Sequence, residues 1–225
     1  YLYYLKGYNV AVVDCDYPQH SISAMRKRDA EQVNGDEYYK QLAFHQFKTL
    51  GKKAYPVLCS SPDEAIKTAD EFLASAGMDY DVVFFDLPGT VNSAGILHTL
   101  MGMDYIFSPI TADRVVVEST LSFTQALTDI IMKSGGSTIK GIHLFWNQVD
   151  RREKSELYDL YGKFIADLGF SLMKIYVTDS KRFRKESEAM EKTPFRSSLL
   201  PPDQRLMTAC QLDLFIQEFL RTIEL

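Results

Sequence analysis

Carboxylates close two short apolar runs in the sequence. Asp14 ends the first run (NVAVVD) and Asp86 ends the second (DVVFFD). Oxygen ligands of this kind suit Mg²⁺, which prefers oxygen donors and keeps several of its own waters when it acts beside phosphates. Asp16 stands two residues after Asp14 and therefore faces the same side of an extended chain, where it is placed to orient an attacking water. The spacing indicates a cation site for phosphate chemistry.

A third apolar run ends in an amide. The run IKGIHLFWN closes with Asn147, and the polar residues Asp150 and Arg152 follow. Asn147 either binds a ligand or closes an Asx turn, and the sequence leaves both open. A lone Asp at the end of a strand is usually a turn or cap residue. Three polar strand ends in corresponding places instead favour one shared crevice, because ligands of open parallel sheets bind beyond the carboxyl ends of the strands.

Short apolar runs alternate with helical patterns along the chain, and this alternation positions the polar side chains. The strand-like runs are Asn9–Asp14, Tyr55–Leu58, Asp81–Asp86, Asp104–Pro109, Ile139–Asn147 and Leu172–Val177. The helical patterns cover Asp36–Leu50, Pro62–Ala76, Arg114–Lys133, Arg152–Leu168 and Asp203–Leu225. The alternation predicts an α/β fold, with a mostly parallel, twisted sheet and helices on both faces. The length of 225 residues suits a single domain over 1–225.

Three segments fall outside this alternation. Ser21–Gly35 is polar, with basic residues at 26–28, and is expected to be a mobile connection. Ser197–Pro202 predicts a turn before the last helix. Tyr1–Gly7 has the pattern of a helix end, with a cation in its last turn and a Gly stop, so we expect further chain before Tyr1.

Composition excludes several classes of protein. Hydrophobic residues make up 46% of the chain and charged residues 24%, which is ample for a folded core and rules out disorder throughout. No apolar run reaches the length of a membrane span. The net charge of −5 argues against a globally basic nucleic-acid binder, although a local basic patch stays open. The three cysteines lie far apart without a CxxC pair, which indicates a reducing compartment, so we expect a soluble, cytoplasmic protein.

The segment Leu5–Gln19 resembles the part of the ParA/Soj/MinD family of deviant Walker A ATPases that follows the phosphate-binding loop. In that family a helix ends near a Gly, a hydrophobic strand follows, and the motif D-x-D-P-Q comes next. Asp81–Gly89 (DVVFFDLPG) resembles the Walker B strand of the family, and Asp104–Pro109 resembles its strand ending in Pro. Gly141–Arg152 resembles the strand that leads to an Asn near the base, and Val177–Phe195 resembles the loop and short helix that close the nucleotide site. The likeness runs in order over nearly the whole chain and implies a P-loop NTPase-like fold with ATP and Mg²⁺ as cofactors.

The resemblance implies a role for each matching residue. Asp16 matches the carboxylate that positions the hydrolytic water. Asp14 and Asp86 match the residues that bind Mg²⁺ through its waters. Asn147 matches the residue near the adenine, and Asp179 falls in the closing loop and is assigned with it to nucleotide binding.

Basic residues near the C-terminal third match positions that ParA-like proteins use to bind DNA without sequence preference. Arg152 and Arg182 fall at such positions, and the patch is extended by Lys181, Arg184 and Lys185. A patch of this kind neutralises backbone phosphates and reads no bases, so its affinity falls steeply with salt. The other interpretation of the run KRFRK is a solvated helix face that nearby glutamates balance: Glu186, Glu188 and Glu191.

The sequence departs from the family pattern in three ways. The phosphate-binding loop K-G-G-x-G-K-[ST] is absent from these residues, and so is the central first strand of the family. We therefore expect an N-terminal extension that carries both, without which the chain is not expected to bind ATP tightly. Tyr17 is inserted before Pro18 in the loop that presents Asp16. Thr178 stands where the family commonly has a Pro, which leaves base contacts there open.

The resemblance implies a ParA-like ATPase that dimerises around ATP and binds DNA non-specifically. Stimulated by a partner protein of the ParB type, it would act in the partition or maintenance of a plasmid, a chromosome or a conjugative element. The alternative is an ATP-independent scaffold with the same fold, which the inserted Tyr17 favours. A membrane role of the MinD type is disfavoured, because Gln211–Leu225 carries three acids and one Arg rather than a basic face.

Overall fold

The computed structural model describes residues 1–88, 94–134, 138–152, 155–180 and 197–225. The chain divides into two compact units. Of the described residues, the first unit holds 1–99 and 197–203, and the second holds 100–180 and 204–225. Each unit has its own parallel sheet, and a single domain over 1–225 stays a prediction.

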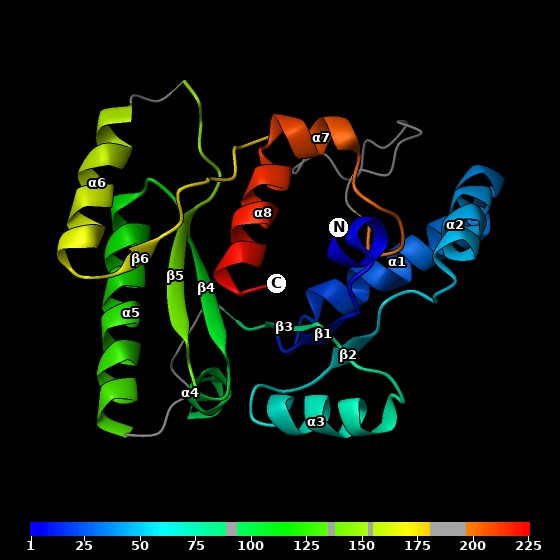
Figure 1. Ribbon diagram of the computed structural model, residues 1–225, viewed down its shortest axis with the longest axis horizontal. Helices are drawn as coiled ribbons and strands as arrows, with labels where there is room; N and C mark the ends of the chain where they lie inside the picture. The colour runs from blue at the N-terminus through cyan, green and yellow to red at the C-terminus, as the bar shows by residue number, and fades with distance from the viewer. Residues whose placement is uncertain (89–93, 135–137, 153–154, 181–196) are drawn as a thin grey trace. The chain divides into compact units, whose positions relative to one another are not determined.

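The sheet of the first unit has three parallel strands in the order β2-β1-β3 (Figure 1). These are β1 (Val10–Asp14), β2 (Val57–Cys59) and β3 (Val82–Asp86). Every residue of β1 is buried, because the strand lies in the middle of the sheet and is apolar on both faces. The three strands confirm the predicted runs, and their register pairs Asp14 with Asp86 on one side and with Cys59 on the other.

Of the helices in the first unit, those near Asp36–Leu50 and Pro62–Ala76 follow the predicted patterns, whereas those over 21–35 and 94–101 were not predicted. The helices are α1 (Ser21–Gly35), α2 (Glu37–Leu50), α3 (Ala65–Ser75) and the first part of α4 (Ala94–Met101), which continues into the second unit. Helix α2 begins where the carboxylate of Asp36 accepts the amide of Tyr38 at 2.8 Å. A single π-helical turn, η1 (Leu2–Lys6), ends at Gly7 with φ 82°, as the Gly stop predicts.

Helix α1 shows that the expectation of a mobile connection over Ser21–Gly35 is wrong. Its apolar residues form no clear stripe, so hydrophobic periodicity does not reveal it. Polar contacts to residues outside the helix hold it instead. The amide of Ser23 donates to the carboxylate of Asp14 at the beginning of the helix, and Asp29 binds Ser198 further along. The partners of Ser23 and Asp29 both lie outside the helical stretch, so these contacts leave no pattern within it.

Ser198 is the centre of a buried polar cluster that joins the turn at 197–202 to α1. The carboxylate of Asp29 accepts both the amide and the hydroxyl of Ser198, at 2.6 and 2.7 Å. Arg26 donates to the hydroxyl and the carbonyl of Ser198, and the hydroxyl of Tyr4 donates to the same carbonyl at 2.8 Å. The guanidinium of Arg26 also lies over the ring of Tyr55, 4.5 Å from its centre. The predicted turn is thus confirmed and is held by the first unit.

The sheet of the second unit is also parallel, with the order β4-β5-β6 (Figure 1). Its strands are β4 (Tyr105–Ile110), β5 (Gly141–Trp146) and β6 (Ser171–Leu172). The connecting helices are α5 (Arg114–Ser134) and α6 (Ser155–Asp167), and the C-terminal helices are α7 (Gln204–Ala209) and α8 (Leu212–Thr222). Parallel strands joined through helices confirm the predicted α/β class.

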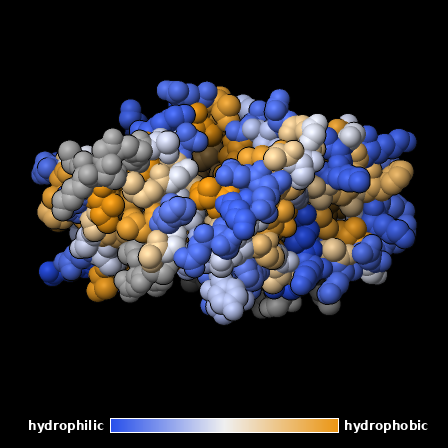
Figure 2. All heavy atoms as spheres, turned by 90° about the horizontal axis from the view of Figure 1, so that it is seen from below, coloured by the Kyte–Doolittle hydropathy of each residue, from blue (hydrophilic) through white to orange (hydrophobic). Residues whose placement is uncertain are grey.

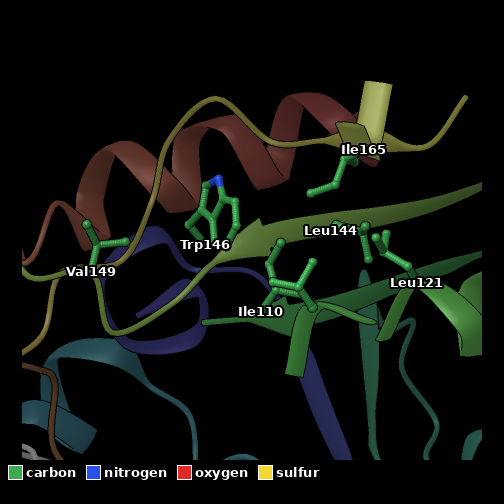
Figure 3. Packing of buried hydrophobic residues seen from close by; sticks show 7 residues of the cluster. Ile110, Leu121, Leu144, Trp146, Val149 and Ile165 are labelled. Atoms are coloured by element: carbon green, nitrogen blue, oxygen red, sulfur yellow. The ribbon is translucent and has the colours of Figure 1, made fainter. Parts of the chain in front are cut away.

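The core of the second unit lies between the sheet and the two connecting helices. Ile110 and Leu144 are fully buried, and Trp146 lies beside them (Figure 3). Leu121 of α5 and Ile165 of α6 complete this layer. The alternate residues of the strands face α8 instead, because successive side chains of a strand point to opposite faces. The ring centres of Phe107 and Phe219 are 4.8 Å apart, so helices cover both faces of this sheet, as predicted.

The run Leu172–Val177 forms a strand only at its beginning. Beyond Leu172, the carboxylate of Glu218 in α8 accepts the amides of Lys174 and Ile175, at 2.8 and 2.7 Å. A side chain therefore satisfies the backbone donors of this segment, and the strand that the apolar run predicted stops after two residues.

The predicted helix Asp203–Leu225 is divided into α7 and α8. Gln211 between them has φ 58°, a left-handed conformation that interrupts the helix. Among the described residues, no helix is long and apolar enough to span a membrane.

Replacing Asp29 by Ala should lower the free energy of unfolding by about 2 kcal/mol, because the buried amide and hydroxyl of Ser198 then lose their acceptor. Urea titration of the purified chain measures this loss. Glu31 is an exposed acid on the same helix, and Glu31→Ala should change stability by less than about 0.5 kcal/mol. Equal stability of the two variants would mean that the Ser198 cluster does not hold α1.

Candidate functional site

The carboxyl ends of β1 and β3 bring three predicted site residues together. Asp14 and Asp86 are partners in the parallel register, and Asp16 follows two residues after the end of β1. Asp14 is fully buried, whereas Asp16 and Asp86 are partly exposed. Because neighbouring parallel strands end at the same edge of a sheet, the carboxylates gather at the position where open α/β sheets bind ligands.

The carboxylate of Asp14 is held at the N-terminus of α1. Its Oδ2 accepts the amide of Ser23 at 2.8 Å, and its Oδ1 lies 3.4 Å from the amide of Asp16. A carboxylate in the first turn of a helix is favoured by the free amides and by the helix dipole. Asp14 thereby joins the strand to the helix and holds the backbone from which Asp16 projects.

The negative charges of these carboxylates repel one another. Burial raises the pKa of Asp86 above its ordinary value, and the neighbouring charges of Asp14 and Asp16 raise it further. Burial, together with Asp14 and Asp86, raises the pKa of the Cys15 thiol to about 12, so this thiol is neutral at pH 7 and is not a nucleophile. A bound cation would neutralise this excess of negative charge.

The three carboxylates offer oxygen atoms, which are the ligands that a hard cation such as Mg²⁺ prefers. Among the described residues, no three His, Cys, Asp or Glu side chains converge closely enough to ligate a metal ion directly. Binding through water molecules does not require a direct ligand set, and the crowded acidic side chains around Asp86 suit a cation held in this way.

The loop after β1 contains contacts that the sequence analysis missed. His20 has φ 44°, and its Nδ1 lies 3.1 Å from the carbonyl oxygen of Asp14. The inserted Tyr17 is 67% exposed, and its ring meets that of His20 edge-on, with the centres 5.8 Å apart. The spacing of residues carries no signal for His20, because its position follows from a tight loop in which its amide donates to the carbonyl of Asp16 at 2.7 Å.

Cys59 is a second residue of this edge that the sequence analysis missed. It ends β2, and its Sγ lies 2.9 Å from the hydroxyl of Ser23. The next amide, that of Ser60, donates to the carbonyl of Asp14. The sequence does carry a signal for this position, because ligands bind at the carboxyl ends of parallel strands and Cys59 directly follows the weak run Tyr55–Leu58.

The second unit holds the two predicted nucleotide-binding residues, Asn147 and Asp179. The segments that carry them are adjacent, because Val149 and Thr178 form a parallel bridge and the amide of Asp179 donates to the carbonyl of Val149. The side-chain oxygen of Asn147 accepts the amide of Gln148 at 2.9 Å, a local contact of the kind seen in turns. Both interpretations of Asn147 therefore stay open.

Thr178 is buried at the position where the family commonly has a Pro. Its hydroxyl donates to the carbonyl of Ala209, and its amide lies 3.4 Å from the carbonyl of Cys210. These contacts attach the segment to the end of α7, so Thr178 serves the packing of its own unit.

Of the five predicted DNA-binding residues, Arg152 is the one that lies within the described part of the chain. Its guanidinium donates to both oxygens of Asp150, at 3.0 and 2.7 Å, on the exposed surface. The hydrogen bonds from Arg152 lower the pKa of Asp150 to about 2. An exposed ion pair of this kind contributes little to stability. The other four, Lys181, Arg182, Arg184 and Lys185, lie outside the described residues.

Comparison with known proteins shows that this chain is similar to solved structures in its fold. No family model matches the sequence, and no curated protein matches it. A solved structure described as a partition protein matches 94% of this chain with a TM-score of 0.50 and 15% identity. This chain has the fold of that partition protein. It spans 64% of the other chain's length, so it corresponds to less than two thirds of that protein.

A second solved structure is a plasmid partition protein from Borrelia burgdorferi. It matches 80% of this chain and 80% of its own, with a TM-score of 0.47 and 16% identity.

The raised pKa of Asp86 predicts a dependence of stability on pH. A carboxyl group with a raised pKa binds its proton more tightly in the folded protein, so its stabilising contribution is complete below the ordinary value of 3.8 and is lost as pH rises through the raised pKa. Asp86→Asn should therefore be more stable than the parent protein at pH 7, and the difference should disappear at about pH 3.

Urea titration across this pH range measures the effect. Asp70, an exposed acid on α3, supplies the control, because Asp70→Asn should leave the pH profile of the parent protein unchanged. A parent protein more stable than Asp86→Asn at pH 7 would contradict the repulsion among the three carboxylates.

Proposed function

We propose that this chain is part of a ParA-like ATPase that binds ATP and Mg²⁺ as a homodimer. It acts in the cytoplasm in the partition or maintenance of a plasmid, a chromosome or a conjugative element. The observation that carries the proposal is the pairing of Asp14 with Asp86 at the ends of adjacent parallel strands, with Asp16 two residues beyond. The fold shared with a solved partition protein supports it.

In this function the three carboxylates have separate tasks. Asp14, which is buried and held by the amide of Ser23, and Asp86, which is more exposed, bind the waters of Mg²⁺. Asp16 orients the attacking water as a general base. When bound, Mg²⁺ neutralises the charge that develops on the transferred phosphate.

The remaining parts of the nucleotide site belong to the proposal as well. The motif K-G-G-x-G-K-[ST] does not occur in these 225 residues, so ATP binding is proposed for a protein in which such a loop is present. Asn147 and Asp179 are proposed as contacts to the nucleotide. A partner protein of the ParB type is proposed to stimulate hydrolysis.

An ATP-independent scaffold is the second candidate, and one observation favours it. The carboxylate of Asp14 is fully buried and already binds the amide of Ser23, which is what a purely structural helix cap does. In a scaffold, the acidic edge has no cation to bind. Mg²⁺ would then leave the stability of the protein unchanged, whereas a cation site makes the protein more stable as Mg²⁺ is added.

Asp16→Ala should retain ATP binding and lose turnover by about 10²- to 10⁴-fold, because the water then lacks its base. The experiment uses a protein that includes the phosphate-binding loop, with ATP binding and phosphate release measured on the same preparation. Asp70→Ala, which removes an exposed acid on α3, should keep full turnover. Unchanged turnover in Asp16→Ala would remove this residue from the reaction.

Reversing two basic residues tests DNA binding. Arg182→Glu combined with Lys185→Glu should abolish binding to duplex DNA of arbitrary sequence at low salt, because phosphate contacts supply the affinity. Fluorescence anisotropy with labelled DNA measures it. The matched control makes the same charge change at the exposed residues Lys27 and Arg28 of α1 and should keep binding. If the first variant keeps full DNA binding, the run KRFRK is a solvated helix face instead.

A further inference from the structure

Helix α6 has more apolar surface than the core of its own unit covers. One row of its residues, Tyr158, Tyr161 and Ile165, packs into that core. A second row of large apolar side chains is exposed, and its members are Leu157, Leu160 and Phe164 of α6 and Leu168, which directly follows the end of the helix. Leu160 is 64% exposed and Phe164 is 50% exposed, which is unusual for neighbouring side chains of this size. Figure 2 shows that apolar residues reach the surface in several places between hydrophilic ones. The row on α6 differs from the other exposed apolar residues by its regular spacing in the sequence.

The four exposed residues form one stripe along the helix, called the α6 stripe below. Their spacings of three, four and four residues place them on one side, and the amide of Leu168 still donates to the carbonyl of Phe164. The stripe is roughly 16 Å long at 1.5 Å per residue. Together with the buried row it makes an apolar arc of roughly 160°, where a helix on the surface of a domain needs about 100°. Helix α6 therefore has apolar surface for a second neighbour.

The outer rim of the stripe is acidic. Glu156 and Asp167 are exposed beside it, and Lys163 and Asp159 are exposed further round the same side of the helix. Within the described part of the chain, no ion pair joins any of these four side chains to another residue. Two excess negative charges next to an apolar stripe attract a basic surface, and they repel an anionic lipid surface or the same rim of a second copy.

We propose that the α6 stripe is the docking surface for a basic amphipathic helix of a partner protein. Such a helix presents apolar residues at positions i, i+3 or i+4, and i+7, and carries Lys or Arg at their edge. The straight stripe of about three turns matches one helix packed along another. The inference uses none of the residues of the carboxylate edge, so it is independent of the proposed nucleotide chemistry.

The first test uses a synthetic amphipathic helix of Leu and Lys, and a twin in which Glu replaces every Lys. We expect the chain to bind the Lys peptide at least about tenfold more tightly than the Glu peptide. Leu160→Glu and Phe164→Glu should each weaken binding of the Lys peptide at least about tenfold, as expected for anchors at the centre of an interface. The control is Phe44→Glu, which makes the same change at a 62% exposed residue of α2 and should leave binding unchanged.

Charge reversal at the rim supplies a second test that leaves the apolar stripe intact. In the double variant Glu156→Lys with Asp167→Lys, the preference should invert toward the Glu peptide. Circular dichroism and thermal unfolding check that every variant is folded as the parent protein is.

Three outcomes would overturn the proposal. The first is equal binding of the Lys peptide by Phe164→Glu and Phe44→Glu. The second is a dimer in sedimentation that Leu160→Glu dissociates, which would assign the stripe to a second copy of the chain. The third is binding to anionic phospholipid vesicles that Leu160→Glu abolishes, which would assign it to a lipid surface.

Discussion

The hydrogen bond from the Ser23 amide to the buried carboxylate of Asp14 is the contact on which the first unit depends. A buried carboxylate is costly unless donors satisfy it, so β1 can end in Asp14 only where a helix begins beside it. Helix α1, placed in this way, carries Arg26 and Asp29 to the Ser198 cluster. One polar contact at the end of a strand thus determines where the helix begins and, through it, where the turn at 197–202 is held.

At the same edge, electrostatic repulsion opposes stability. Three carboxylates at the ends of two adjacent strands repel one another, and the raised pKa of Asp86 expresses that cost. A fold selected for stability alone gains nothing from this arrangement. It becomes understandable when a cation shares the site, because the charge that destabilises the free protein then binds the ligand. The buried thiol of Cys15, neutral at pH 7, contributes packing beneath the carboxylates and no further charge.

The second unit is held mainly by apolar contacts, together with one acidic side chain. Helices lie on both faces of its sheet, and Glu218 of α8 binds two amides beyond β6, which ends that strand early. Helix α6 contributes one apolar row to the core and presents another to solvent. An exposed apolar row with an acidic rim is not needed for this core, and so it indicates a surface kept for another molecule.

The sequence by itself determined the strands, most of the helices, the α/β class and the candidate carboxylates. These depend on local properties, namely apolar runs, helix caps and the residue type at a strand end, which the chain displays without being folded. Only the tertiary structure decided the strand order that pairs Asp14 with Asp86, the helix at 21–35, and the places of His20 and Cys59 at the site. It also decided the early end of β6, through Glu218. Except for His20, whose place follows from a tight local loop, each of these depends on a hydrogen bond or a strand pairing between residues distant in the chain, and such partners are chosen when the chain packs rather than by any local pattern.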